Sequence, residues 1–133
     1  MSILGGPKPV ESVGTRGYRA AMATLNDVRE LALALPGVEE RTSFGTPAFF
    51  VRGRLFARIR EDLETVAVKM EFEERERRLA AEPDVFRLTD HYLKYPMVLV
   101  MLDSADRGQL GQILEAAHAM ESAKKPVRTR RAG

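Results

Sequence analysis

The stretch "VRGRLFARIR", residues 51–60, contains four arginines that never adjoin one another. The arginines share one parity along the chain with a phenylalanine, at positions Arg52, Arg54, Phe56, Arg58 and Arg60. Successive side chains of a β-strand point to opposite faces, so this spacing predicts one cationic face and one apolar face. Guanidinium groups bind phosphates and an aromatic ring can stack on a base, so the cationic face has the chemistry of a nucleic-acid contact.

Strand pairing extends this cationic face. A four-residue turn at 61–64 would place Arg58 opposite Ala67 and Phe56 opposite Lys69. The candidate nucleic-acid contacts are therefore Arg52, Arg54, Phe56, Arg58, Arg60, Lys69 and, in a later loop, Lys94. The alternative is an ordinary solvated sheet face, whose arginines pair with nearby carboxylates such as Glu39, Glu40, Glu61 or Glu64. The sequence leaves both interpretations open.

A second group of reactive side chains lies in "TDHYLKYP", residues 89–96. Asp90 could orient His91 for acid–base chemistry, and Tyr92 and Tyr95 offer phenols. No nucleophile accompanies them, so structural hydrogen bonds, ligand contact and catalysis all remain open, and no residue is assigned a catalytic role. If the loops at 42–47 and 90–96 meet, they predict a groove lined by Ser43, Phe44, His91, Tyr92 and Tyr95.

Metal and cofactor chemistry finds little support in the composition. There is no cysteine, and the two histidines, His91 and His118, lie on separate predicted elements. Glutamates at 71–76 fall near a helix start, where carboxylates interact favourably with the helix dipole. We expect no metal site and no cofactor.

The elements that must position these residues can be read from hydrophobic spacing and turn residues. Thr24 and Asp27 form a capping-box pattern, and Pro36-Gly37 ends the first predicted helix. Residues 38–47 look like a loop. Alternation then predicts strands at 48–51, 55–60 and 65–70, a helix at 72–84 anchored by Phe72 and Leu79, a strand at 97–102, and a helix capped by Asp106. This order, α-β-β-β-α-β-α, predicts a two-layer α+β domain with an antiparallel sheet and helices packed on one face.

Charge is distributed unevenly over the 133 residues, whose net charge is +2. Residues 1–21 are predicted to be a flexible leader, 22–123 the folded domain, and 124–133 a basic disordered tail. The tail has five Lys and Arg and no acid, whereas residues 22–123 hold 13 Lys and Arg against 18 Asp and Glu. A nucleic-acid function therefore needs a local basic face or the tail. The absence of cysteine and of a long apolar segment leads us to expect a cytoplasmic protein with no membrane contact.

Two stretches, "LPGVEERTSFGTPAFFVRGRLFARI" and "TDHYLKYPMVLVML", resemble the MmcQ/YjbR family of small bacterial proteins. The resemblance covers roughly residues 24–120. It implies an α/β fold related to secretion-chaperone-like and frataxin-like architectures, and DNA binding through a "double wing" of hairpins. It transfers no catalytic residues, and the leader and the "KKPVRTRR" tail lie outside the family pattern.

We therefore expect a non-enzymatic DNA-binding module that uses a basic β-hairpin face, with weak and largely sequence-independent affinity. The alternative is a module that binds a small ligand or a protein in the groove between the 42–47 and 90–96 loops. A third interpretation is an enzyme whose active site lies in the same groove.

Overall fold

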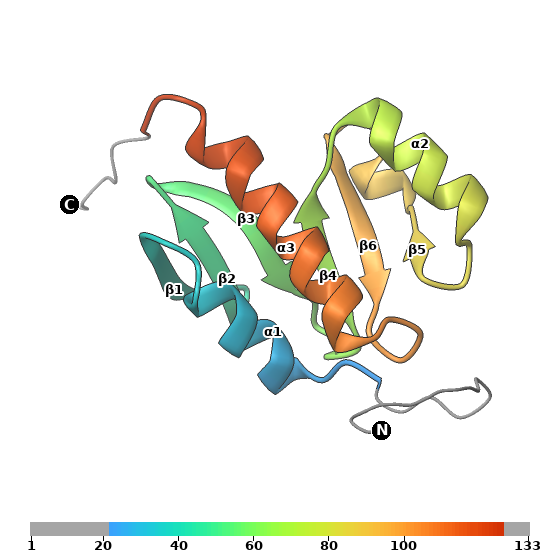
Figure 1. The fold of residues 1–133 in the computed structure, drawn as a ribbon, viewed down its shortest axis with the longest axis horizontal. Coiled ribbons are helices and arrows are strands. Elements are labelled where there is room, and N and C mark those ends of the chain that lie inside the picture. Colours follow the sequence, from blue (N-terminus) through green and yellow to red (C-terminus); the bar gives the residue numbers. More distant parts are fainter. Residues whose placement is uncertain (1–21, 127–133) are drawn as a thin grey trace, which may run out of the picture.

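The computed structural model describes residues 22–126 and shows an α+β domain with a six-stranded antiparallel sheet (Figure 1). The strands lie in the order β1-β2-β3-β4-β6-β5, and α3 crosses one face of the sheet. The elements are α1 (Leu25–Leu33), β1 (Val38–Ser43), β2 (Thr46–Val51), β3 (Arg54–Ile59), β4 (Thr65–Lys69), α2 (Phe72–Ala81), β5 (Phe86–Arg87), the 3-10 turn η2 (Asp90–Tyr92), β6 (Met97–Met101) and α3 (Arg107–Ser122). The predicted fold class is confirmed, and two strands are added to it.

The two outer helices begin where their capping residues predict. The Asp27 amide donates to Thr24 Oγ1 at 3.1 Å, and the Thr24 amide donates to Asp27 Oδ2 at 2.9 Å, which completes the capping box. Asp106 caps α3 by accepting from the Gln109 amide at 2.7 Å. These bonds satisfy amides that the first helical turn leaves without partners.

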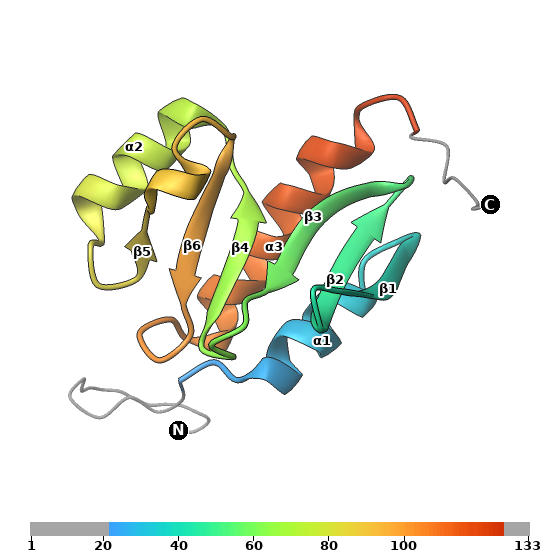
Figure 2. The ribbon, with the colours of Figure 1, turned by 180° about the vertical axis from the view of Figure 1, so that it is seen from behind.

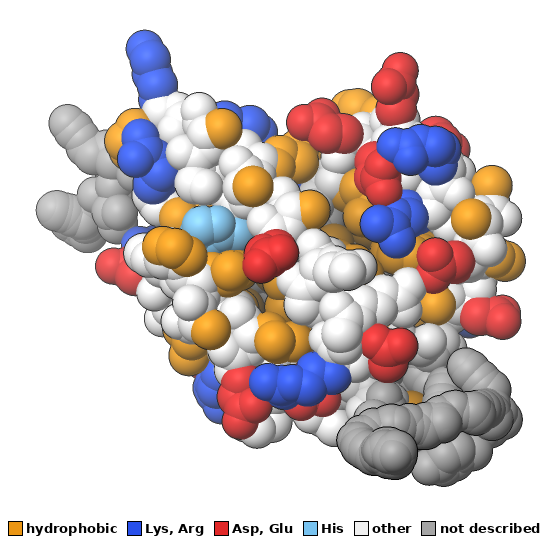
Figure 3. Space-filling model, in the orientation of Figure 1, with side chains coloured by type: hydrophobic (Ala, Val, Ile, Leu, Met, Phe, Trp, Pro, Cys, Tyr) orange, Lys and Arg blue, Asp and Glu red, His pale blue; other side chains and the backbone are white. Residues whose placement is uncertain are grey.

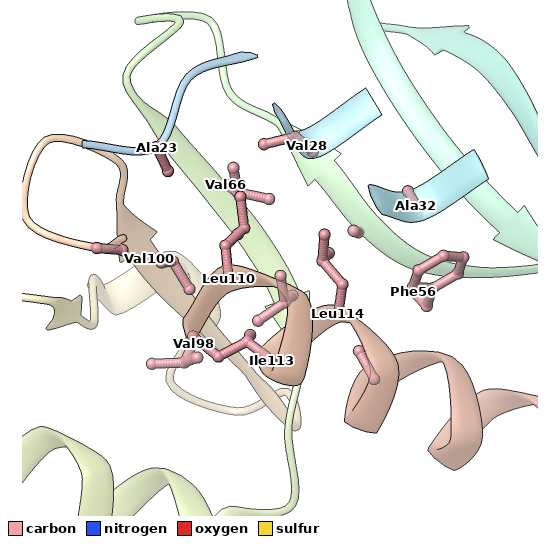
Figure 4. Packing of buried hydrophobic residues seen from close by; sticks show 14 of the residues in the cluster. Ala23, Val28, Ala32, Phe56, Val66, Val98, Val100, Leu110, Ile113 and Leu114 are labelled. Atoms are coloured by element: carbon pink, nitrogen blue, oxygen red, sulfur yellow. The ribbon is translucent and has the colours of Figure 1, made fainter. Parts of the chain in front are cut away.

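The main core lies between the sheet and the helices. Leu110, Ile113, Leu114 and Ala117 of α3 are buried against strand residues that include Val66 and others of β3, β4 and β6 (Figure 4). Their spacing of three and four residues places them on one helix face. The face of the sheet away from α3, the open face, is seen in Figure 2 with the strands in front of that helix.

The prediction that residues 38–47 form a loop is wrong, because residues 38–43 are strand β1. It pairs along its whole length with β2, from Val38 opposite Val51 to Ser43 opposite Thr46. Phe44 and Gly45 close the hairpin with φ of 55° and 82°. An edge strand can be polar because backbone hydrogen bonds hold it, so hydrophobic alternation does not reveal it.

The predicted register of β3 and β4 is confirmed, but the predicted faces of β3 are only partly right. Arg58 lies opposite Ala67, and the Arg60 amide bonds the Thr65 carbonyl at 2.9 Å. Against β2, however, β3 carries one extra residue, Phe56, between the pairs Phe49–Ala57 and Phe50–Leu55. Such a bulge turns two consecutive side chains to the same side of the sheet.

Phe56 consequently occupies the core and not the cationic face. Its side chain is fully buried in the main cluster (Figure 4). Its ring meets that of His118 edge-on, with the ring centroids 5.6 Å apart. A buried ring cannot stack on a nucleic-acid base. The proposed stacking role of Phe56 is therefore wrong.

The second helix is anchored differently from the prediction. Leu79 packs against the core as expected, but Phe72 is 45% exposed. The fully enclosed residue of α2 is Arg75, which is 3% exposed. The helix is thus held to the sheet by a buried cation as well as by apolar contact.

The ends of the chain are only partly described. The predicted leader 1–21 and residues 127–133 of the predicted tail lie outside the described residues, whereas Lys124 and Lys125 are placed. Among residues 22–126, no helix has the length and apolar character needed to span a membrane.

The burial of Phe56 gives a test against a matched phenylalanine. We expect Phe56→Ala to lower the free energy of unfolding by about 3–5 kcal/mol, because it leaves a cavity in the main core. Phe44→Ala, at a ring that is 80% exposed, should change it by about 1 kcal/mol or less. Urea denaturation of the two variants measures both values. Equal effects would contradict the bulge.

Candidate functional site

The bulge at Phe56 divides the four arginines of residues 51–60 between the two faces of the sheet. Arg54 lies opposite Val51, a core residue, and its side chain turns toward α3. Arg58 lies opposite Ala48 and Ala67 and points to the open face. The expected single cationic face is therefore replaced by two separate groups.

The first group lies where the β2–β3 hairpin meets the end of α3. Arg52 Nε donates to the Lys124 carbonyl at 3.3 Å, and Arg54 Nε donates to the Lys125 carbonyl at 2.9 Å. We call this region the basic corner; it consists of Arg52, Arg54, Lys69, Lys124 and Lys125. Lys and Arg side chains are visible at this end of the molecule, where α3 ends (Figure 3). The C-terminus of a helix carries partial negative charge, which favours cations there.

A buried carboxylate organises the basic corner. Glu121, on the last turn of α3, is fully buried. Its Oε2 lies 2.8 Å from Lys124 Nζ and 3.5 Å from Lys69 Nζ, and its Oε1 lies 3.6 Å from Arg54 Nη1. One carboxylate thus joins helix α3 to strands β3 and β4 and cannot neutralise all the cations around it. Arg54 and Lys69, both expected on a free cationic face, are partners of this carboxylate.

The second group, which we call the open-face cluster, consists of Phe44, Arg58, Arg60, Glu61 and Tyr92. The guanidinium of Arg58 lies over the Phe44 ring at 5.1 Å, and that of Arg60 over the Tyr92 ring at 5.5 Å. Phe44 belongs to the β1–β2 turn and Tyr92 to η2, so two segments far apart in sequence meet on neighbouring arginines. The 42–47 and 90–96 loops thus each supply one ring to this cluster, and the groove between them stays a prediction.

Glu61 supplies the carboxylate of the open-face cluster. Arg58 Nη2 donates to its Oε2 at 2.8 Å, and Arg60 Nε lies 4.0 Å from its Oε1. The pKa of Glu61 lies below its ordinary value, first because its own backbone amide donates to the carboxylate and then because Arg58 does. Glu61 is therefore ionised at neutral pH. Its pairing with Arg58 is what the alternative interpretation of this face expected, in which the arginines pair with nearby carboxylates.

The 90–96 loop is held by Arg75 of α2. Its Nη1 donates to the carbonyls of Tyr95 at 2.8 Å, Met97 at 3.1 Å and Tyr92 at 3.3 Å, and its Nη2 donates to that of Leu93 at 3.3 Å. A planar guanidinium can serve several carbonyls at once, which an ammonium cannot do with the same geometry. The loop is therefore fixed by an arginine that the sequence interpretation did not consider.

One interpretation of the sequence was that the polar side chains of this loop hold it in place by hydrogen bonds. The described residues do not show such bonds. Within residues 22–126, neither His91 nor the two tyrosines makes a side-chain hydrogen bond; His91 instead contacts the rings of Tyr92 at 4.7 Å and Tyr95 at 6.2 Å. Tyr92 is buried in a small apolar cluster on the open face with Met97 and Leu99, whereas Tyr95 is 51% exposed.

The remaining predicted site residues lie apart from these contacts. Ser43 precedes the hairpin turn, where its carbonyl accepts from Thr46 Oγ1 at 3.1 Å. Lys94 is exposed on the loop and forms no ion pair within the described part of the chain. Over residues 22–126, no three His, Asp or Glu side chains are grouped to hold a metal ion.

Two residues that sequence reasoning missed, Arg75 and Glu121, carry a recognisable signal. Glu121 continues the buried α3 stripe at a spacing of four from Ala117, and Arg75 falls three residues after Phe72 and four before Leu79. A charged side chain in register with an apolar helix stripe is expected to be buried and paired. The helical spacing identifies the position of Glu121, whereas for Arg75 the stripe is incomplete because Phe72 is exposed.

Comparison with known proteins decides the family. Residues 33–120 match the model of the family described as YjbR. The chain belongs to the YjbR family. A similar solved structure is that of the Deinococcus radiodurans protein DR2400, whose domain is described as DUF419. It has 27% sequence identity and a TM-score of 0.67, over 77% of this chain and 81% of that one. No curated protein matches the sequence.

The Arg75 contacts predict the effect of removing them from this YjbR domain. Arg75→Ala should lower the free energy of unfolding by about 2–4 kcal/mol, because charge-assisted hydrogen bonds are lost and carbonyls lose their donor. Arg75→Lys should recover only part of this. Arg77→Ala on the same helix, at an exposed site, and His91→Ala should each change it by less than about 0.5 kcal/mol. Thermal and urea unfolding measure these values; a stable Arg75→Ala variant would refute the clamp.

Proposed function

We propose that this YjbR domain is a non-enzymatic nucleic-acid-binding module, and that the basic corner is its contact surface. The binding is weak and largely independent of sequence, because phosphates and not base edges are contacted. The observation that supports this most is the joining of the β2–β3 hairpin tip to the end of α3 by the bonds from Arg52 and Arg54 to residues 124 and 125.

The hairpin tip has a suitable shape for such a contact. Arg52 and Gly53 form its two-residue turn, with φ of 56° and 79°, and Arg52 is exposed. A two-residue turn is a tight hairpin connection, and the Arg52 side chain reaches from it to the end of α3. The tip therefore presents an arginine beside the exposed Lys125, and the sequence continues with Arg128, Arg130 and Arg131.

The distribution of charge favours the basic corner, and not the surface of the domain in general, as the nucleic-acid contact. Residues 22–126 hold 15 Lys and Arg against 18 Asp and Glu, so the surface in general repels a polyanion. The basic corner holds five cations and one buried carboxylate, Glu121, which pairs with three of them, Arg54, Lys69 and Lys124. A local excess of this kind orients a polyanion toward one region of an otherwise acidic protein.

The environments of the two histidines do not support a catalytic role. His118 Nε2 lies 2.8 Å from the Pro36 carbonyl, and His91 contacts aromatic rings. Within the described residues, neither is paired with a carboxylate or with a nucleophile that it could activate. This arrangement favours a binding role over an enzymatic one.

Charge-neutral variants of the corner test the proposal. Arg52→Gln with Lys125→Gln should weaken binding to every duplex sequence alike, from a dissociation constant of about 10⁻⁴–10⁻⁶ M at physiological salt. It should also reduce the slope of log K against log salt by about 1.8, since each phosphate contact contributes about 0.9. Fluorescence anisotropy with labelled duplexes at several salt concentrations measures both.

The matched control removes two charges from the open face, with Arg87→Gln and Lys94→Gln. Both residues are exposed and form no ion pair within residues 22–126, so total charge changes equally. We expect the control to keep the parent's slope. A slope lowered only by the control would move the contact to the open face, and equal slopes in parent and corner variant would refute the proposal.

A further inference from the structure

Arg58 on the open face has donors that the rest of the fold does not use. The residue is 8% exposed, and its Nε and Nη1 are buried without a hydrogen-bond partner in the described residues; only Nη2 is bonded, to Glu61. The Nε of the neighbouring Arg60 is likewise buried without one. Buried guanidinium donors without acceptors destabilise a fold, and a ligand that supplies acceptors would remove this cost.

Phe44, which covers Arg58, has an unfavourable backbone conformation. It occupies the first central position of a two-residue turn with φ of 55°, where Gly, Asn and Asp are favoured. Its side chain is 80% exposed, so the strained conformation gains almost no core burial. What the position provides is a ring 5.1 Å from the Arg58 guanidinium. Strain combined with exposure at one residue is common at binding sites.

Glu61 shows which chemical group the two arginines bind. Its carboxylate bridges them, bonded to Arg58 at 2.8 Å and 4.0 Å from Arg60. Glu61 lies in a turn, and its side chain is 57% exposed, so it can move away without disturbing the core. Asp62 adds a second carboxylate near Arg60, but neither carboxylate accepts from the unused donors described above.

We infer that the open-face cluster binds a small molecule that carries an oxyanion next to a flat apolar ring. The oxyanion takes the place of the Glu61 carboxylate on Arg58 and Arg60, and the ring packs against the exposed face of Phe44. Guanidinium groups bind carboxylates and phosphates through paired N–H donors, and they also lie over aromatic faces, so both halves of the ligand have partners. This site is independent of the basic corner.

The first experiment compares three probes by two-dimensional amide NMR of the whole chain: phenyl phosphate, benzoate and inorganic phosphate. We expect either ring-bearing probe to shift the amides of residues 43–46, 58–61 and 91–95, and to bind about fivefold more tightly than inorganic phosphate because of aromatic contact. A preference between phenyl phosphate and benzoate identifies the oxyanion as phosphate or carboxylate. Binding of neither ring-bearing probe, or equal affinity for inorganic phosphate, overturns the inference.

Removal of the internal carboxylate provides the sharper test. Glu61→Gln should tighten binding of the preferred probe by about two- to fivefold, the strength of the exposed ion pair that competes with it. Glu64→Gln, in the same turn and without an arginine contact in the described structure, is the matched control and should leave affinity unchanged. Equal affinities in the Glu61→Gln and Glu64→Gln variants would contradict the inference.

Two further variants separate the halves of the site. Phe44→Ala should abolish the preference for the ring-bearing probe while leaving inorganic phosphate binding unchanged or tighter, because the Arg58 donors are uncovered. Arg60→Gln should weaken the preferred probe by about tenfold or more, as expected for loss of charge-assisted bonds. The Arg52→Gln, Lys125→Gln variant should bind that probe like the parent. Loss of binding in this last variant would place the probe at the basic corner and refute an open-face site.

Discussion

A single extra residue in strand β3 determines where the charged chemistry of this protein lies. Without the bulge at Phe56, all four arginines of residues 51–60 would share one face of the sheet. With it, Arg54 turns toward α3, while Arg58 stays on the open face. Burial of Phe56 in the core stabilises this arrangement, because returning the ring to the surface would remove a large apolar side chain from the main cluster.

The two groups of cations then follow from what each face of the sheet offers. Toward the helices, Arg54 meets the last turn of α3 and the buried carboxylate of Glu121, and the hairpin tip and helix end become one basic corner. Toward the open face, Arg58 and Arg60 meet aromatic rings and Glu61. Arginines spaced along one strand thus lie in two different environments.

Buried charge has a related structural role elsewhere in the domain. Arg75 gathers four carbonyls of residues 92–97 and so fixes the loop that carries Tyr92 beneath Arg60. The open-face cluster therefore depends on helix α2, which contributes no residue to it. Such bonds, together with the apolar packing of Tyr92, specify one conformation of an irregular loop.

The sequence by itself determined the fold class, the family, the caps at Thr24 and Asp106 and the pairing of β3 with β4, because these depend on local spacing and turn residues. Only the tertiary structure decided that residues 38–43 form an edge strand, since backbone pairing needs no apolar pattern there. It alone decided the face of each arginine, because a bulge shifts parity through the partner strand. The partners of Glu121 and Arg75 were decided in the same way, because they lie on segments brought together only when the chain folds.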